Sequence, residues 1–567
     1  MKRANRFAAC AIAALLCSFF CFPCAAAYSD YIGGIPEARD EVGGYYAGSG
    51  VLGLSQYLLS ESVITPLAAE RLDENGDGIL NALDASLRKR RLLKNPDEVM
   101  RSHFNSTFIE GWLANDFSEE QWQETISQWQ AVGITSVIIG ETVIREASGE
   151  INAFYSSSLV LSPENTALGG KIHYDSVDKI LSHCQAAGIK CFVSMGTDSS
   201  FWNINICRHD SSDGPGQEAF IEQTKRLLPY MNELYDLYAS RYPDAFYGWY
   251  FSPEISNSVE YEDVEKCRTG VETLSLVLDL YLAERDRLDA SMPMLLSPYV
   301  NIKAEATWCT HDSAVLGGFW QSVLETAAFR SGDILSPQDS VGAGGMQLEH
   351  LAEWTKAYRT AVDNAGKGMK LWSNAESFRI LTDMHDRSWA ELTQSSFVTT
   401  LVAQLELAEP YVDGFTSCSF SSYYNTVSAG ESYFEAYQQY LRYGVPDSEP
   451  PSPPTEFSVS TVQLSGRNEA AMQLVFSGAH DNIGIARAEI YVDGKLLTYR
   501  VATRWQTWEN GKYIGITEPS GFFDLSFDLG NCERSYEIVL YDCVGNRSEP
   551  VTVRVTASNG ELRAEAV

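Results

Sequence analysis

Strand-like and helix-like segments alternate along residues 99–447, and this alternation limits the possible folds more than any other feature of the sequence. Short apolar runs are each followed by a longer amphipathic pattern. Such alternation predicts parallel strands joined by crossover helices. We count eight candidate strands: 107–110, 136–139, 190–195, 245–255, 293–297, 333–336, 370–376 and 412–418. Eight units of this kind predict an α/β fold, a (β/α)8 TIM barrel with long loops.

Amphipathic patterns predict the helices between these strands. The first begins at a Ser118 cap that is followed by two glutamates, a helix-start signal. The predicted helices span residues 118–130, 175–187, 218–240, 259–287, 348–364, 390–409 and 433–443.

Two of the predicted strands lead into a glutamate. The aromatic stretch 245–255 reaches Pro253 and Glu254, and the stretch 370–378 contains Glu376. The carboxyl ends of barrel strands are where α/β barrels keep their chemistry. Hydrolysis of a glycosidic bond needs two carboxyl groups across that bond, one protonated and one ionised. We therefore predict Glu254 and Glu376 as the catalytic pair, with a helix cap or an ion pair as the structural alternative for each.

Polar and aromatic residues follow several of the strands and could line a sugar-binding cleft. Aromatic rings stack on the C–H faces of sugars, and carboxylates or amides bind the hydroxyl groups. Asp339 is also the main competitor for a catalytic role, and core packing is the alternative for each aromatic residue. The predicted substrate-binding residues are Glu110, Trp112, Trp202, Tyr299, Gln338, Asp339, Trp372, Asn374 and Tyr423.

Several motifs together resemble a known family. They are residues 248–250 with 253–255, 296–299, 333–335 with 338–342, and 372–378. As a set they resemble a bacterial family of domains of unknown function that is grouped with the TIM-barrel glycoside hydrolases, over about residues 103–425. A related superfamily of barrel glycosidases carries its acid/base on strand four and its nucleophile on strand seven. By that likeness Glu254 is the acid/base and Glu376 the nucleophile, although Pro253 stands where that superfamily commonly has Asn.

The N-terminus predicts export. Basic residues at positions 2, 3 and 6 precede an apolar run over 7–22 and the small residues 25–27, the pattern of a secretory signal peptide over residues 1–27. A retained anchor is the alternative, but the run is short for a membrane span. The formal net charge of -33 disfavours nucleic acid as a partner, because phosphates would be repelled. We expect a secreted, extracellular protein with no membrane span in its mature form.

Residues 28–98 contain a calcium-loop pattern between positions 73 and 84. Oxygen ligands fall at loop positions 1, 3, 5, 7, 9 and 12, with a glycine at position 6 for the sharp turn. The predicted structural calcium ligands are Asp73, Asn75, Asp77, Ile79 (through its carbonyl), Asn81 and Asp84. No cofactor is expected for catalysis.

This loop and the helix predicted over residues 85–93, which ends in Leu92-Leu93, resemble one half of a dockerin. Dockerins carry two such halves and bind a cohesin on a scaffold protein, so the resemblance implies a possible cohesin partner. The segment 52–59 would match the first half, but the loop at 40–47 before it lacks the ligand pattern. A calcium-stabilised helical module without a cohesin is the alternative.

The C-terminal part follows a proline-rich linker at 448–454. Residues 455–567 show short alternating runs, such as 488–492 and 536–540, with the hairpin signal Asp493-Gly494. These features predict a β-sandwich. The stretches 481–484 and 541–546 resemble bacterial immunoglobulin-like modules of secreted enzymes. Eight cysteines follow the signal peptide without CxxC spacing, and a pair between Cys532 and Cys543 is the most plausible local disulfide, with free thiols as the alternative.

Taken together, the sequence predicts a secreted glycoside hydrolase that acts on a polysaccharide or glycan. The alternative is a barrel that binds glycans without cleaving them, attached to a scaffold or cell surface.

Overall fold

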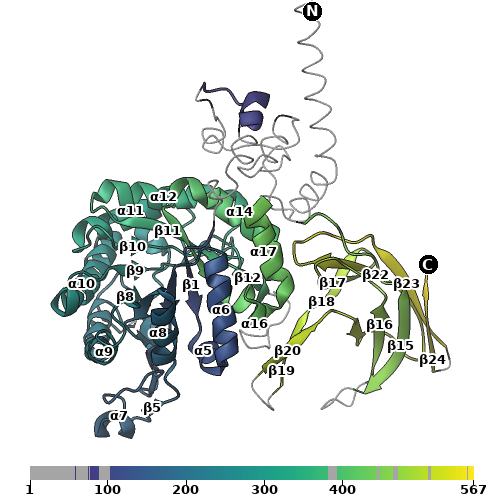
Figure 1. The fold of residues 1–567 in the computed structure, drawn as a ribbon, viewed down its shortest axis with the longest axis horizontal. Coiled ribbons are helices and arrows are strands. Elements are labelled where there is room, and N and C mark those ends of the chain that lie inside the picture. Colours follow the sequence, from purple (N-terminus) through teal and green to yellow (C-terminus); the bar gives the residue numbers. More distant parts are fainter. Residues whose placement is uncertain are drawn as a thin grey trace, which may run out of the picture. The chain divides into compact units, whose positions relative to one another are not determined.

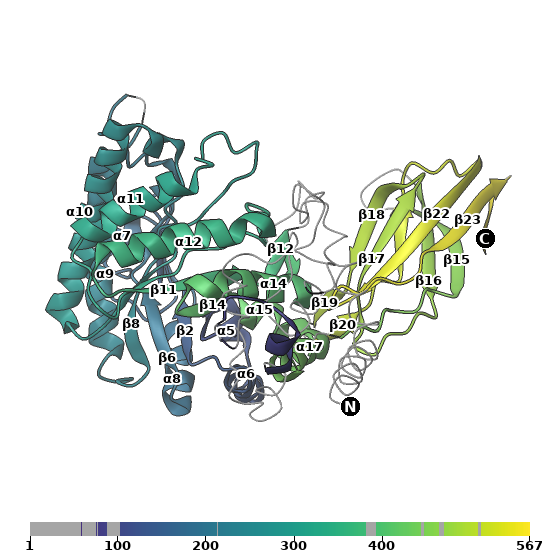
Figure 2. The ribbon, with the colours of Figure 1, turned by 90° about the horizontal axis from the view of Figure 1, so that it is seen from above.

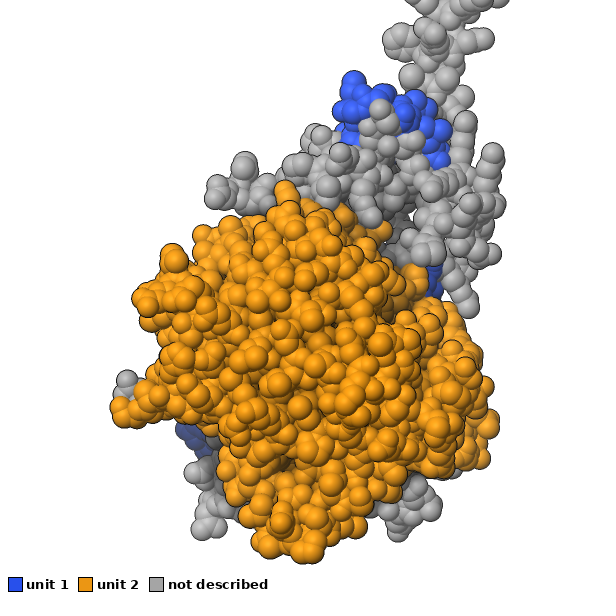
Figure 3. All heavy atoms as spheres, turned by 90° about the vertical axis from the view of Figure 1, so that its left-hand side faces the viewer, with its two compact units in different colours: residues 1–99, 397–400, 428–567 blue, residues 100–396, 401–427 orange. Residues whose placement is uncertain are grey.

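The computed structural model describes residues 58, 75, 77–87, 103–212, 214–380, 393–443, 447–463, 470–507, 512–558 and 560–567. The chain divides into two compact units, one formed by residues 1–99, 397–400 and 428–567, the other by residues 100–396 and 401–427 (Figure 3). The predicted signal peptide, the ligand Asp73 and the loop at 40–47 lie outside the described residues.

The second unit contains a closed barrel of eight parallel strands, which confirms the predicted fold. The hydrogen-bonded order is β1-β14-β11-β10-β9-β8-β6-β2, and β1 pairs with both β2 and β14 to close the sheet. All eight predicted strands are present, with ends that differ by a few residues. They are β1 (Ser106–Ile109), β2 (Ser136–Ile139), β6 (Lys190–Ser194), β8 (Phe246–Phe251), β9 (Met294–Leu296), β10 (Ile334–Leu335), β11 (Lys370–Glu376) and β14 (Gly414–Cys418).

The barrel interior is filled by large side chains that point inward from these strands. Ile138, Phe192, Tyr250, Leu295 and Ile334 form one buried cluster, and Phe108 and Trp372 pack against it. Trp372 is thus part of the barrel core, which corrects its prediction as a sugar-binding residue. It lies four residues before the end of β11, too deep to meet a ligand at the strand ends.

Helices surround the barrel, as Figures 1 and 2 show for α8 to α12. The predicted Ser118 cap is confirmed, because the Ser118 side chain and Gln121 form a reciprocal capping box at the start of α6. The main helices of this unit are α5 (Gly111–Asp116), α6 (Glu119–Ala131), α8 (Ser176–Ala187), α9 (Gln217–Tyr238), α10 (Val264–Asp289), α11 (Ser313–Thr326), α12 (Leu348–Ala365) and α14 (Val398–Ala408).

Two of these helices, the short α5 and the longer α11, were not predicted from the sequence. Helix α11 carries Gly317 and Gly318 at its centre, and glycine weakens a helical pattern. Gly317 has a packing role here, since a Cβ at this position would lie 3.2 Å from the Ala357 carbonyl oxygen of α12. The close contact between the two helices therefore explains a residue that made the sequence pattern unclear.

Two small sheets lie within the loops of the barrel. One contains β5, β4, β3 and β7 in that order, with bounds Lys171–Ile172, Ile151–Ala153, Val143–Arg145 and Thr197–Asp198. The other pairs β12 (Phe378–Ile380) with β13 (Thr393–Ser395) directly after β11. The helix predicted over 390–409 is correspondingly shorter, because β13 occupies its first described residues.

The first unit contains the C-terminal β-structure. A three-stranded sheet (β15, β16, β21) and a five-stranded sheet (β18, β17, β22, β23, β24) share one hydrophobic core, to which Leu474, Phe522, Ile490, Ile538 and Val555 contribute. A hairpin joins β17 to β18 through Asp493 and Gly494, which both have positive φ, so the predicted turn is confirmed. The bounds are β15 (Glu456–Gln463), β16 (Ala470–Ser477), β17 (Ile485–Val492), β18 (Lys495–Val501), β19 (Thr503–Thr507), β20 (Lys512–Thr517), β21 (Gly521–Asp524), β22 (Asn531–Asp542), β23 (Val551–Ser558) and β24 (Glu561–Ala566).

The structure also bears on the predictions about a membrane span and a disulfide. Within the described part of the chain, no helix is both long and apolar enough to cross a bilayer. The eight cysteines from Cys184 to Cys543 are all free. The predicted disulfide between Cys532 and Cys543 is wrong, because the extended strand β22 separates the two residues by roughly 35 Å.

The helix α17 (Glu431–Tyr443), predicted within the barrel segment, groups with the first unit.

The buried ion pair between Arg285 and Asp333 is predicted to dominate local stability. Both side chains are fully buried, the Arg285 Nη1 atom lies 2.8 Å from Asp333 Oδ1, and the same carboxylate accepts the Met294 and Arg330 backbone N–H groups. Asp333→Ala removes the buried partner of Arg285 Nη1 and leaves that charge only the half-exposed Asp286, bound through Arg285 Nε, so we expect it to lower the free energy of unfolding by about 3–5 kcal/mol. Urea denaturation measures this loss. The exposed pair Arg268–Glu272 supplies the control, since Arg268→Ala should cost at most about 1 kcal/mol; equal losses would contradict the assignment.

Candidate active site

The predicted site residues gather at one end of the barrel. Glu110 follows β1, Glu254 follows β8, Gln338 and Asp339 follow β10, and Glu376 is the last residue of β11. Because the strands are parallel in a closed barrel, their carboxyl ends share one rim. Residues more than 200 positions apart in the sequence thereby reach the same region.

Glu254 is half-buried and held by a neighbouring amide. Gln338 Nε2 donates a hydrogen bond of 2.9 Å to Glu254 Oε1. Burial raises the pKa of the Glu254 carboxyl, and the Gln338 hydrogen bond opposes this rise because it favours the ionised form. One oxygen of Glu254 is therefore fixed by the protein.

Glu376 is more deeply buried, with 2% of its surface exposed. Its Oε2 atom accepts the Ala343 backbone N–H at 2.5 Å. Burial raises the pKa of Glu376 well above its usual value, the negative charge of Asp339 adds to the rise, and the charge of Glu254 contributes further. The two predicted catalytic groups are also linked through neighbouring residues, since Gln338 donates to Glu254 and the adjacent Asp339 accepts the Glu376 N–H.

Asp339 is buried directly behind Glu376. Its Oδ1 atom accepts the backbone N–H groups of Val341 and Glu376, both at 3.2 Å, and its Oδ2 atom accepts Gln404 Nε2 at 2.7 Å. Burial raises the pKa of Asp339 to about 6. With both oxygens bound and only 3% of the residue exposed, Asp339 faces the protein. Through its hydrogen bond with the Glu376 N–H, Asp339 helps to position that residue.

Gln404 belongs to this group but was missed in the sequence. It lies on α14 and also donates to the Glu376 carbonyl oxygen at 3.1 Å. Leu401, Leu405 and Ala408 share the same buried stripe of this helix. A glutamine within an apolar stripe is costly to bury unless it is hydrogen-bonded, and that was the available signal.

Tyr299 and Asn374 complete the surroundings of the pair. Burial raises the pKa of Tyr299 to about 12, and the charges of Glu376 and Glu254 both contribute, so its hydroxyl lies near the two carboxyl groups. Asn374 Nδ2 donates to Ser297 Oγ at 2.9 Å, and Asn374 is 1% exposed. The hydrogen bond to Ser297 fixes Asn374 on β11 to the loop after β9.

The other predicted residues lie around the same rim or beside it. Glu110 accepts hydrogen bonds from Ser419 Oγ and Ser422 Oγ, and its charge, together with burial, raises the pKa of Glu141 after β2. Trp112 on α5 is 42% exposed and Trp202 is 63% exposed, so both rings are open to a ligand. The Tyr423 hydroxyl donates to Thr393 Oγ1 at 2.8 Å and its ring packs on Phe378.

A known family of protein domains matches more than half of the chain. A family described as "Domain of unknown function (DUF4434)" matches residues 105–428. No curated protein matches the chain.

Several solved structures show low similarity to the chain. A candidate α-L-fucosidase from Bacteroides thetaiotaomicron is 20% identical with a TM-score of 0.43, and the match covers 60% of this chain and 96% of that chain. The endo-β-1,4-mannanase from Thermotoga petrophila is 12% identical with a TM-score of 0.35, covering 81% and 98%. The xylanase from Thermoanaerobacterium saccharolyticum is 11% identical with a TM-score of 0.32, covering 57% and 89%. The names of all three proteins are those of glycoside hydrolases.

The buried acid Asp339 is predicted to make the protein less stable as the pH rises. The carboxyl has a pKa of about 6 when folded and about 3.9 in an unfolded chain, so between these values the unfolded state loses its proton first. Stability that is present below pH 4 should therefore fall by about 2–3 kcal/mol by pH 7. Asp339→Asn should remove this part of the fall. The asparagine side chain has the same shape as the aspartate it replaces. The Gln404 amide can rotate to accept its N–H group, because Gln404 Oε1 has no hydrogen-bond partner among the described residues.

Urea denaturation at pH 4.5 and pH 7 for both proteins checks this expectation. The exposed Asp116→Asn serves as control and should keep the wild-type difference between the two pH values. If wild type and Asp339→Asn lose equal stability between these pH values, Asp339 is not the buried titrating group.

Proposed function

This chain belongs to the DUF4434 family of domains of unknown function, and we propose that its barrel is a glycoside hydrolase acting on a polysaccharide or glycan through Glu254 and Glu376. The observation that carries the proposal is the position of both carboxyl groups at one barrel rim, where Gln338 donates to Glu254 and the adjacent Asp339 accepts the Glu376 N–H. Each carboxyl has one oxygen held by an N–H donor, from Gln338 and Ala343 respectively. Preorganised acids of this kind suit a reaction that needs both a proton donor and an ionised carboxylate.

The proposal includes an assignment of the proton. Burial raises the pKa of both glutamates, and the charge of Asp339 beside Glu376 raises the pKa of Glu376 further. These directions favour Glu376 as the group that holds the proton and donates it to the leaving oxygen. Glu254 is then the ionised partner that attacks the sugar or activates water. This order is the reverse of the roles that the likeness to strand-four and strand-seven glycosidases implied.

Substitution of either glutamate is expected to abolish most turnover. Glu254→Gln and Glu376→Gln keep the side-chain shape but remove the acid–base function, which should lower the rate by about 10²–10⁴-fold. Reducing-sugar release from a panel of plant and host polysaccharides measures the effect. Glu305→Gln, an exposed carboxylate on the loop after β9, is the matched control and should retain wild-type rates.

The outcomes separate the proposal from its alternative. If wild type binds a glycan but releases no sugar from any of the panel, the barrel is a glycan-binding protein. If Glu376 is the acid, an aryl glycoside with a good leaving group restores bond cleavage to Glu376→Gln, because departure then needs no proton. Restoration of Glu254→Gln instead would reverse the two roles.

We also propose that the loop at 73–84 holds calcium. The described ligand residues supply hard oxygen atoms, the kind that calcium prefers. Asp77 Oδ1 accepts the Ile79 N–H at 2.8 Å, Asp84 Oδ2 accepts the Asn81 N–H at 2.9 Å, and Gly78 has φ +77° at the position of the sharp turn. Asp84 is buried at the start of a described helical segment, residues 82–87. Bound calcium would neutralise these carboxylates and fix the loop to that helix.

We also propose an immunoglobulin-like module at the C-terminal end and export of the protein. The shared core of the C-terminal sheets supports an immunoglobulin-like module over residues 455–567. The basic and apolar pattern of residues 1–27 supports export to the extracellular space, and the calcium loop supports a possible cohesin partner.

Removal of one calcium ligand is predicted to weaken calcium binding. Asp77→Ala takes away a carboxylate at loop position 5, so we expect at least about a tenfold loss of calcium affinity, the effect of one charged contact. Isothermal titration of the calcium-stripped full chain with CaCl2 provides the measurement. The exposed Asp116→Asn control should bind as the wild type does, and an unchanged titration for Asp77→Ala would rule out calcium at this loop.

A further inference from the structure

A second hollow lies at the opposite end of the barrel from Glu254 and Glu376. Its volume is about 440 Å³, within the range of small-molecule sites, about 300–1,000 Å³. Phe246 and Tyr247, which line it, are the first two residues of β8, whereas Glu254 follows the end of that strand. Eight residues of extended chain span roughly 25 Å, so the hollow is separate from the proposed active site.

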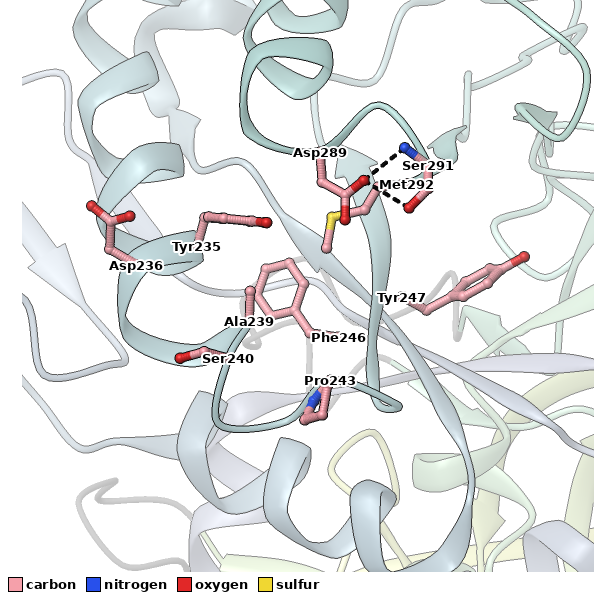
Figure 4. A pocket seen from close by; sticks show the side chains of 10 residues that line it. All are labelled: Tyr235, Asp236, Ala239, Ser240, Pro243, Phe246, Tyr247, Asp289, Ser291 and Met292. Atoms are coloured by element: carbon pink, nitrogen blue, oxygen red, sulfur yellow. Dashed lines mark hydrogen bonds between the residues drawn. The ribbon is translucent and has the colours of Figure 1, made fainter.

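Aromatic side chains line part of the hollow. Phe246 is buried, and its ring meets the Tyr235 ring edge to face at 6.3 Å. Figure 4 shows Tyr235, Phe246 and Asp289 directed toward a common space, with Asp236 at one side and the Tyr247 ring turned outward at the other. Aromatic rings from α9 and β8 therefore offer an apolar surface beside carboxylates.

Several polar atoms in the hollow have no partner within the described part of the chain. Asp289 Oδ1 accepts both the N–H and the hydroxyl of Ser291, at 2.8 and 2.7 Å, while its Oδ2 atom accepts nothing. No hydrogen bond of the described residues engages the Tyr235 hydroxyl or the Asp236 carboxylate. The hollow thus holds two acceptor carboxylates and one phenol that a ligand could use.

Charges of both signs border the hollow. The helices α9 and α10 both end here, and a helix C-terminus carries partial negative charge, to which Asp236 and Asp289 add. Positive charge comes from Lys190, whose Nζ lies 4.1 Å from the centre of the Tyr247 ring, and from Arg330, whose Nη2 donates to the Met292 carbonyl at 3.1 Å. Aromatic faces and acceptor oxygens favour a ligand with C–H faces and hydroxyl donors.

We propose that this hollow is a second carbohydrate site, which binds a neutral sugar while the rim with Glu254 and Glu376 acts on the glycan. The choice of a sugar as ligand rests on the proposed function. The Tyr235 ring, supported from behind by the buried Phe246, packs against the sugar ring, and Asp289 Oδ2 and Asp236 accept its hydroxyl groups. The site would hold a polysaccharide chain at a distance from the point of cleavage.

Isothermal titration of the full chain tests the site. The probes are cellohexaose, mannohexaose, xylohexaose and maltohexaose as neutral sugars, with hexagalacturonate as the acidic and hexaglucosamine as the cationic comparison. The protein carries Glu376→Gln so that no probe is cleaved. We expect a neutral probe to bind at a site whose affinity falls at least about tenfold with Tyr235→Ala or Asp289→Asn, the loss of one well-made contact. Tyr235-dependent binding of hexagalacturonate and of no neutral probe would contradict the proposal.

Matched variants separate binding from folding. Leu237→Ala changes an exposed residue of the same helix outside the hollow and should leave the affinity unchanged. Tyr235→Phe retains the ring, so a milder loss than with Tyr235→Ala is expected if stacking matters. Thermal denaturation confirms that each variant is folded.

Each outcome decides the proposal. Absence of any Tyr235-dependent binding over the probes would overturn it, as would binding of hexaglucosamine alone, which would make the hollow an ammonium site. Turnover in the chain with native Glu376 should be unaffected by Tyr235→Ala on a soluble short substrate. Because binding is measured without cleavage, a failure of the glutamate assignment leaves this result readable, and the reverse also holds.

Discussion

The seam of the barrel depends on Asn105. Its backbone N–H donates to the Phe415 carbonyl, its carbonyl accepts the N–H groups of Thr135 and Ser136, and its side-chain Oδ1 accepts the Phe415 N–H. One residue therefore links the first strand to both of its neighbours. Gly414 permits this closeness, because a Cβ there would lie 2.6 Å from Asn105 Oδ1. Without closure the strand ends would not form one rim, and Glu110 could not meet Ser419, 309 residues away.

The strands were predictable because each is a short buried run between turn residues, and burial in a parallel barrel leaves that pattern in the sequence. The position of a side chain along the barrel axis could not be predicted in the same way. Trp372, Asn374 and Glu376 are spaced two residues apart along β11, so their side chains lie on the same face of the strand, toward the barrel interior. Only the closed structure shows that Trp372 lies in the core, Asn374 above it and Glu376 at the rim.

Contacts between helices and loops were equally hidden from local patterns. Gly317 reads as a helix breaker in the sequence, yet it allows α11 and α12 to approach. Gln404 lies 65 residues from Asp339, and its partner is set by how α14 packs on the barrel. Propensity and periodicity describe single elements, whereas these residues are defined by pairs of elements. The candidate glutamates could be predicted because their signal, an acid after a strand, lies within one element.

The buried acids at the rim explain why the proton assignment differs from the one expected by strand position. A carboxyl at the end of strand seven is the ionised group only where positive charge or hydrogen bonds outweigh its burial. Here the Ala343 N–H favours ionisation of Glu376, but Asp339 places a second negative charge beside it and Gln404 holds that charge in place. In the proposed mechanism the role of each glutamate follows from its immediate neighbours, and Asp339 is the neighbour that favours a proton on Glu376.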